Sequence, residues 1–290
     1  MKRFVTTACF FTLNAVLAIA APPAEVPKVS EGSKVAQPFF RDKAVERQPV
    51  HAADSGPVVV NAASYLLGIS PGGLATVFGT NLSDVTGVVL AGVNPFPLVL
   101  ADVSVTVNGI PAPMFSVAYA NGQDQISFQV PWDTNVGPGA ARVRVYDYGR
   151  LVADVIVDSY TEDPGIFAFS KYGQLYAVAL HSDDYSLVTP DNPAYRGEVL
   201  ILYTTGLGPV DAFIRDGYGA PSNPLANTKF PFRVVLGGED TRLYFSGLAP
   251  GFVGLYQVNM RVPDDLPSGD LTLKILSEYA NSQTVLLTVR

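Results

Sequence analysis

Hydrophobic and polar residues alternate in several short segments between residue 57 and the end of the chain. Val103-Ser104-Val105-Thr106-Val107 alternates strictly and stops at Asn108-Gly109, a pair typical of tight hairpin turns. Residues 142–145 and 271–275 alternate in the same way. A period of two places one face of a sheet in the core and the other in water. Since we find no convincing apolar stripe of helical period over ten or more residues, the pattern predicts an all-β fold.

An internal repeat divides this part of the chain into two copies. The segment QISFQVP at 125–131 matches QVNMRVP at 257–263, an offset of 132 residues. Three further pairs keep the same order with slightly different offsets: 77–82 with 202–207, 105–109 with 234–238, and 139–145 with 269–275. Four ordered matches indicate a duplication with altered loops. Each copy has about seven expected strands, so we predict two tandem immunoglobulin-like β-sandwiches, at 57–163 and 164–290.

The first 20 residues have the features of a secretory signal peptide. Lys2 and Arg3 precede an apolar run that ends in Ala18-Ile19-Ala20, a small-x-small cleavage pattern. A membrane anchor is the alternative, but polar residues dilute the run, which is near the lower length limit for a bilayer span. Residues 21–56 combine five prolines with interleaved charges and are predicted to form a flexible linker, with Phe39-Phe40 as its notable apolar spot. No later segment is apolar enough to span a membrane, so we expect a secreted or cell-envelope protein.

Cysteine usage and charge narrow the chemistry. Cys9 is the single cysteine and lies inside the predicted signal peptide, so disulfides and thiolate catalysis are not expected in the mature chain. Removal of Lys2 and Arg3 leaves 17 basic and 26 acidic residues, a net charge of −9. An acidic surface disfavours binding to nucleic acid, which requires clustered Lys and Arg. We expect neither a cofactor nor a bound metal.

Four stretches carry a resemblance to a known family: residues 59–82, 163–167, 192–210 and 245–269. In them the chain resembles the Solibacter-type uncharacterised C-terminal domain family, a β module of secreted proteins of Acidobacteria. It resembles more distantly the IPT/TIG immunoglobulin-like domains. The resemblance spans nearly all of 57–290 and implies the fold and an extracytoplasmic location. It supplies no catalytic residues.

Two patterns resemble catalytic sites. Gly68-Ile69-Ser70-Pro71-Gly72 fits the G-x-S-x-G motif of a hydrolase, but Pro71 has no N–H for the oxyanion hole, so we interpret the segment as a turn. Asp133 and Asp265 follow a strand-ending proline in both copies, and we interpret them as a shared turn rather than an active site.

His181 is the single histidine of the two copies. Beside Asp183 and Asp184 it offers a general base or a weak metal ligand. We favour a polar hairpin tip, because Asp side chains stabilise turns. This hairpin, from Leu175 to Thr189, is expected as an addition at the start of the second copy.

Three aromatic residues are candidate ligand contacts: Trp132, Phe252 and Tyr256. For Phe252 and Tyr256 we favour packing against the core or the first domain, because two closely linked sandwiches need an apolar joint. The sequence therefore predicts a non-catalytic structural or adhesion-type module that binds an unidentified glycan or envelope protein. A secreted hydrolase with carboxylates at the domain junction is the alternative. A third hypothesis is an assembly scaffold that pairs edge strands between chains.

Overall fold

The computed structural model describes residues 56–134 and 139–290. In these two ranges it contains only strands, turns and irregular segments, so they include no helix that could span a membrane. The strands form four sheets, which confirms the predicted all-β class. The predicted signal peptide and the linker up to residue 55 lie outside the described residues.

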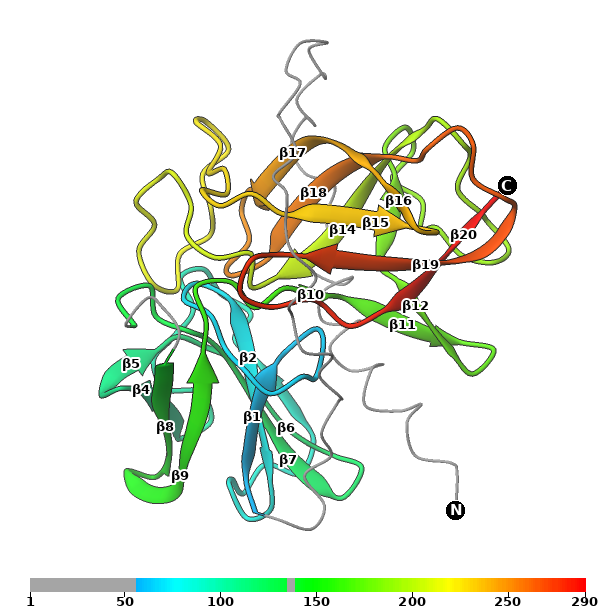
Figure 1. Ribbon diagram of the computed structural model, residues 1–290. Coiled ribbons are helices and arrows are strands. Elements are labelled where there is room, and N and C mark those ends of the chain that lie inside the picture. Colours follow the sequence, from blue (N-terminus) through cyan, green and yellow to red (C-terminus); the bar gives the residue numbers. More distant parts are fainter. Residues whose placement is uncertain (1–55, 135–138) are drawn as a thin grey trace.

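Strands β1–β9 form the first sandwich (Figure 1, blue to green). One sheet has the order β1 (Val58–Asn61), β2 (Leu74–Gly79), β7 (Gln123–Gln129), β6 (Met114–Ala120) and β3 (Val88–Leu90). The other has the order β5 (Ile110–Ala112), β4 (Val103–Val107), β8 (Gly139–Asp147) and β9 (Arg150–Ser159). The inward residues of both sheets share one core, in which Phe128 and Val105 are buried.

Strands β10–β20 form the second sandwich (Figure 1, green to red). One sheet contains β10 (Gly165–Ile166) and β13 (Ala179–His181), both paired with β14 (Val199–Thr205), then β18 (Tyr256–Arg261) and β17 (Arg242–Leu248). The other has the order β11 (Ala168–Lys171), β12 (Gln174–Ala177), β20 (Val285–Val289), β19 (Gly269–Leu276), β15 (Arg233–Leu236) and β16 (Glu239–Asp240). Their inward side chains form a second core that includes Leu202 and Ile275.

The strand order reproduces the repeat in the sequence. β7 and β18 carry the match with an offset of 132 residues. Each pairs with the strand that carries the match of 77–82 with 202–207: β7 with β2, and β18 with β14. The order β5-β4-β8-β9 recurs as β16-β15-β19-β20. The matched segments therefore occupy equivalent places in two copies of one sandwich.

The second copy does contain an extra hairpin, but its predicted position, from Leu175 to Thr189, is wrong. β13 bridges back through Leu180 and Leu187, as the first sandwich bridges Val60 and Leu67. The N–H of Tyr185 donates to the carbonyl of His181 at 3.0 Å, and Tyr65 donates to Asn61 in the same way. This hairpin is thus another repeated element, and the addition in the second copy is the preceding hairpin β11–β12. The sequence hides this because, of residues 61–65 and 181–185, only the tyrosine is shared.

Candidate binding site between the two sandwiches

The two sandwiches are joined by an apolar cluster that draws on both. Ala62, Ala63 and Leu74 of the first sandwich pack with a larger set from the second: Phe167, Phe169, Tyr176, Val178, Leu180, Ile201, Tyr203, Ala249 and Leu255. Burial of apolar surface stabilises such a joint by roughly 25 cal/mol per Å². The prediction of an apolar joint is confirmed, with Leu255 buried in it and Phe252 packed against it.

Buried hydrogen bonds fix the joint in one arrangement. The N–H of Leu74 donates to the hydroxyl oxygen of Thr205 at 2.8 Å, and that hydroxyl donates to the carbonyl of Gly254 at 2.8 Å. The amide of Asn61 donates to the carbonyl of Asp163 at 2.6 Å. Each of these groups is buried, so an alternative arrangement would leave them without partners.

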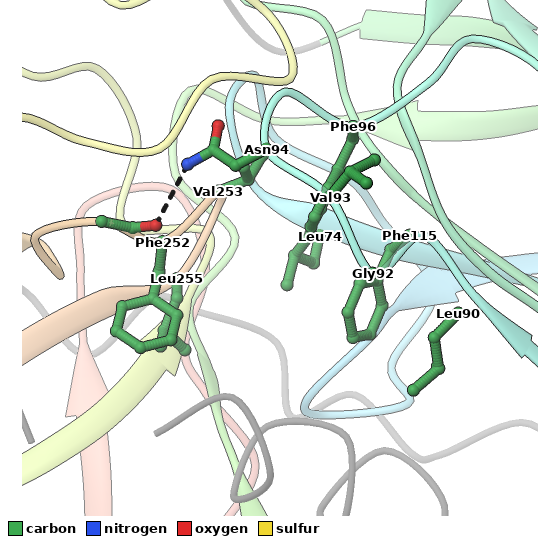
Figure 2. A pocket seen from close by; sticks show the side chains of 11 residues that line it. Leu74, Leu90, Gly92, Val93, Asn94, Phe96, Phe115, Phe252, Val253 and Leu255 are labelled. Atoms are coloured by element: carbon green, nitrogen blue, oxygen red, sulfur yellow. Dashed lines mark hydrogen bonds between the residues drawn. The ribbon is translucent and has the colours of Figure 1, made fainter. Parts of the chain in front are cut away.

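A pocket of about 300 Å³ opens at one side of this joint. Its first wall comes from the start of β2, from β3 and the loop after it, and from β6. Its second wall is the loop between β17 and β18. The lining residues are Leu74, Leu90, Gly92, Val93, Asn94, Phe96, Phe115, Gly251, Phe252, Val253 and Leu255. Figure 2 shows Phe252 and Leu255 on one side of the space and Leu74, Phe115 and Leu90 on the other.

The walls of this pocket, which we call the joint pocket, are apolar. Leu74 and Leu255 are buried at its inner end, whereas Leu90 and Val93 at the opening are 41% and 59% exposed. Asn94 supplies the single polar side chain of the lining. That side chain is engaged, because it donates to the carbonyl of Gly251 at 3.4 Å (Figure 2). It also accepts from the N–H of Gly219 at 3.0 Å. The lining contains no carboxylate, so the pocket itself offers no acid–base pair.

Strand β3 runs to the opening of the joint pocket and is the edge of its sheet. The carbonyl of Gly87 and the N–H of Ala91 bond to β6. In an antiparallel pair such residues alternate, so Val88 and Leu90 direct their N–H and C=O groups away from β6. Within the described ranges no strand pairs with that free side. An open row of backbone donors and acceptors therefore adjoins an open apolar pocket.

The three aromatic residues that are candidate ligand contacts lie in different surroundings. Phe252 lines the joint pocket. Tyr256 is fully buried in the core of the second sandwich and donates from its hydroxyl to the carbonyl of Gly208 at 2.5 Å, so it packs as favoured and is not a ligand contact. The residue starts β18, a central strand that is buried on both faces, which the sequence pattern did not reveal.

Trp132 is half-buried rather than exposed, which corrects its expected place on the surface. Its ring packs against the core of the second sandwich and lies against Gly72. Its N–H on the backbone donates to Asp216 at 2.8 Å. Burial raises the pKa of Asp216, although the bond from Trp132 opposes that rise. Trp132 therefore belongs to the joint.

The other sequence candidates have structural roles. Ser70 is buried in a turn before β2, without the helix that a nucleophile elbow requires. Asp133 and Asp265 lie in exposed turns, as predicted. In the ranges that the structure describes, no group of three or more His, Cys, Asp or Glu side chains is arranged to hold a metal ion.

His181 lies at the start of the predicted hairpin turn, but it is not part of a polar tip. Its ring is buried, and Nδ1 lies 3.1 Å from a carboxylate oxygen of Glu198. Burial raises the pKa of Glu198, and the bond from His181 opposes the rise. His181 occupies the place that Asn61 has in the first copy. The second copy therefore has the buried ring of His181, paired with Glu198, where the first copy has the buried amide of Asn61.

Sequence reasoning missed the pocket residues at 90–96. The segment Gly92-Val93-Asn94-Pro95-Phe96 combines turn residues with apolar ones, and the next apolar pair, Leu98 and Val99, is also exposed. Apolar residues in a segment with the composition of a loop are a usable signal, because such residues either cover a core or form a site. The partner loop at 251–255 lies about 160 positions later in the chain, so the pocket was invisible in sequence.

No protein-family model and no curated protein matches the chain, so the family resemblance stays a prediction. Solved structures are similar at low identity. The Bacteroides ovatus mixed-linkage glucan utilization locus protein SGBP-B, solved with a heptasaccharide, is 12% identical with a TM-score of 0.32 over 77% of this chain. The Escherichia coli adhesin FdeC is 14% identical with a TM-score of 0.24 over 81%. The surface layer protein SbsC, domains 4–9, is 12% identical with a TM-score of 0.24 over 81%. The chain spans 42%, 64% and 31% of these three structures.

Proposed function

We propose that the chain is an extracytoplasmic, non-catalytic module that binds a partner protein at the joint pocket. The signal-peptide pattern of residues 1–20 supports the location. The observation that carries the binding role is the open apolar pocket between two sandwiches, since exposed apolar concavities are typical of interaction sites.

The geometry favours an extended segment of the partner as the bound element. Such a segment adds to the free side of β3 and bonds to the backbone groups of Val88 and Leu90. Alternate side chains of an added strand point to the same face, so one apolar side chain enters the pocket between Val93 and Phe252. Backbone bonds supply affinity and the pocket supplies selectivity.

The composition of the lining selects among the hypotheses for this site. A glycan needs several free polar groups around an aromatic ring, whereas the one polar side chain, Asn94, is already bonded across the joint. The hydrolase alternative needs two carboxylates near the reacting bond, and the lining has none. An apolar side chain from a protein fits the pocket better than either.

A peptide selection tests this proposal. Random 12-residue peptides displayed on phage are selected on the mature protein, and the dissociation constants of the enriched peptides are measured by fluorescence anisotropy. We expect Leu90→Asp and Val93→Asp to weaken binding by about 30-fold each, because a charge in an apolar anchor site is unfavourable. Ile156→Asp on β9 is the matched control, since Ile156 is 64% exposed but lies in the other sheet.

The backbone contribution is tested on the peptide rather than on the protein. Methylation of alternate peptide nitrogens removes the donors that face β3 and is expected to abolish binding, while methylation in the opposite register is tolerated. The proposal is overturned if no peptide is enriched, or if the enriched peptides bind Leu90→Asp and Val93→Asp as tightly as the wild type.

A further inference from the structure

Six tight turns in the described residues place two consecutive residues in the left-handed region. Three of them use Asn108-Gly109, Asn121-Gly122 and Gly237-Gly238, which accept that conformation easily. A fourth uses Ala101-Asp102, whose side chains are small. The other two use Tyr148-Gly149 and Tyr172-Gly173, with a φ of 47° at Tyr148 and 53° at Tyr172. A bulky residue there is strained, so a tyrosine requires a compensating reason.

Packing of the ring compensates for the strain at two other tyrosines with a positive φ, Tyr65 and Tyr185, but not at Tyr148 and Tyr172. Tyr65 lies 5.9 Å from the ring of Phe78, and Tyr185 packs against the apolar cluster of the joint. In contrast, Tyr148 and Tyr172 are 70% and 73% exposed. Their rings therefore recover little of the strain through burial.

Tyr172 differs from Tyr148 in the groups around it. The ammonium of Lys171 lies 2.5 Å from Asp191 and 5.4 Å from the centroid of the Tyr172 ring. The hydroxyl of Tyr172 donates to the other oxygen of Asp191 at 3.4 Å. An exposed ring is thus held beside one hydrogen-bond donor and one acceptor. The charged neighbours that act on Tyr148 are all carboxylates, those of Asp84, Asp102 and Asp147.

We infer that Tyr172, Lys171 and Asp191 form a carbohydrate-binding site at the tip of the β11–β12 hairpin, separate from the joint pocket. An aromatic face accepts the C–H face of a pyranose ring, while the carboxylate accepts from a sugar hydroxyl and the ammonium donates to another. A protein partner is less well served, because the site combines a 73% exposed ring with a charged pair, whereas protein anchors are fully desolvated. One ring gives weak affinity, so the fitting ligand is a polysaccharide that presents many equivalent sugars.

The test is affinity electrophoresis of the mature protein in gels that contain soluble β-glucan, xylan, galactomannan or dextran. We expect at least one of these polysaccharides to retard the wild type, and Tyr172→Asn to lose at least about nine-tenths of the retardation. Because Asn relieves the strain, the same variant should raise the melting temperature by about 2 °C. A gain in stability together with a loss of binding separates a binding role from a structural one.

Matched variants complete the test. Tyr148→Asn is expected to raise the melting temperature by a similar amount and to leave the retardation unchanged. Asp191→Asn is expected to weaken the retardation. Leu90→Asp should leave the retardation intact, which distinguishes this site from the joint pocket. The inference is overturned if none of the four polysaccharides retards the wild type, if Tyr172→Asn is retarded equally, or if that substitution lowers the melting temperature.

Discussion

The N–H of Leu74 donates a 2.8 Å hydrogen bond to the hydroxyl of Thr205, from the start of β2 in one sandwich to the end of β14 in the other. Both strands carry the same segment of the internal repeat, so opposite ends of two equivalent strands meet at the joint. The Thr205 hydroxyl also holds Gly254 in the loop that forms the second wall of the joint pocket. One side chain thus links both walls of the pocket.

Thr205→Val should loosen this link. The substitution keeps the shape of the side chain but leaves the buried N–H of Leu74 and the carbonyl of Gly254 without their partner. We expect the free energy of unfolding to fall by about 1–3 kcal/mol, measured by urea denaturation. The neighbour Thr204 is the matched control: it is equally buried, but its hydroxyl has no hydrogen-bond partner among the described residues. Thr204→Val should therefore be neutral or stabilising, and an equal loss in both variants would refute the role of Thr205.

Gly72→Ala should disturb the packing of Trp132. A methyl group at Gly72 would overlap the indole ring, and the φ of 75° is itself unfavourable for alanine. We expect a loss of about 2–4 kcal/mol in the free energy of unfolding and a shift of the Trp132 fluorescence to longer wavelength. Gly109→Ala isolates the backbone effect, since Gly109 has a φ of 83° and open space around it, and should lose about 1 kcal/mol. Similar losses in the two variants would argue against a close contact with Trp132.

Glu162 should make the stability of the protein depend on pH. This residue lies in the segment between the two sandwiches and is buried. Burial raises the pKa of Glu162 from 4.5 to about 7; the nearby hydroxyl of Ser277 opposes the shift, and the charge of Glu278 adds to it. The folded state thus holds the proton more tightly than the unfolded state, so this contribution is complete below about pH 4.5 and is lost as the pH rises to about 7.

The change is on the order of 3 kcal/mol in the free energy of unfolding between pH 4.5 and 8. It is measured by urea denaturation across that range, as the difference between the wild type and Glu162→Gln. The variant should be the more stable protein at pH 8, because a neutral amide replaces a buried charge. If the two proteins show parallel pH profiles, Glu162 titrates at an ordinary pKa and this explanation fails.

Residues 1–20 should direct export. Fused to an alkaline phosphatase that is active only outside the cytoplasm, they are expected to give activity in bacterial cells. Leu13→Arg with Leu17→Arg interrupts the apolar run and should abolish that activity. Activity that survives this double substitution would remove the support for an extracytoplasmic location.

Local patterns were sufficient for much of the fold. The alternation at 103–107 became β4 with those bounds, because every second residue enters the core and the Asn108-Gly109 turn ends the strand. The repeat located equivalent strands because their inward positions carry similar packing demands. For Tyr256 the sequence favoured packing but left a ligand contact open, because the polar residues Gln257 and Asn259 conceal that β18 is covered on both faces. His181 was misjudged because its partner, Glu198, lies on the neighbouring segment rather than in the turn.

The joint pocket, in contrast, could not be predicted from local patterns in the sequence. Its walls come from loops of different copies, and neither loop has a period that indicates a surface. Their meeting depends on how the two sandwiches pack, which is decided by the apolar cluster and by bonds such as that from Leu74 to Thr205. A single sequence does not encode that meeting in any local pattern.

The most direct test of the proposed binding function is hydrogen–deuterium exchange of the mature protein with and without a selected peptide. We predict that the peptide slows exchange in two segments together, residues 87–94 of the first sandwich and 251–255 of the second, including the outward N–H of Leu90. Protection in only one sandwich, or at a surface away from both segments, would contradict a binding site built by the joint.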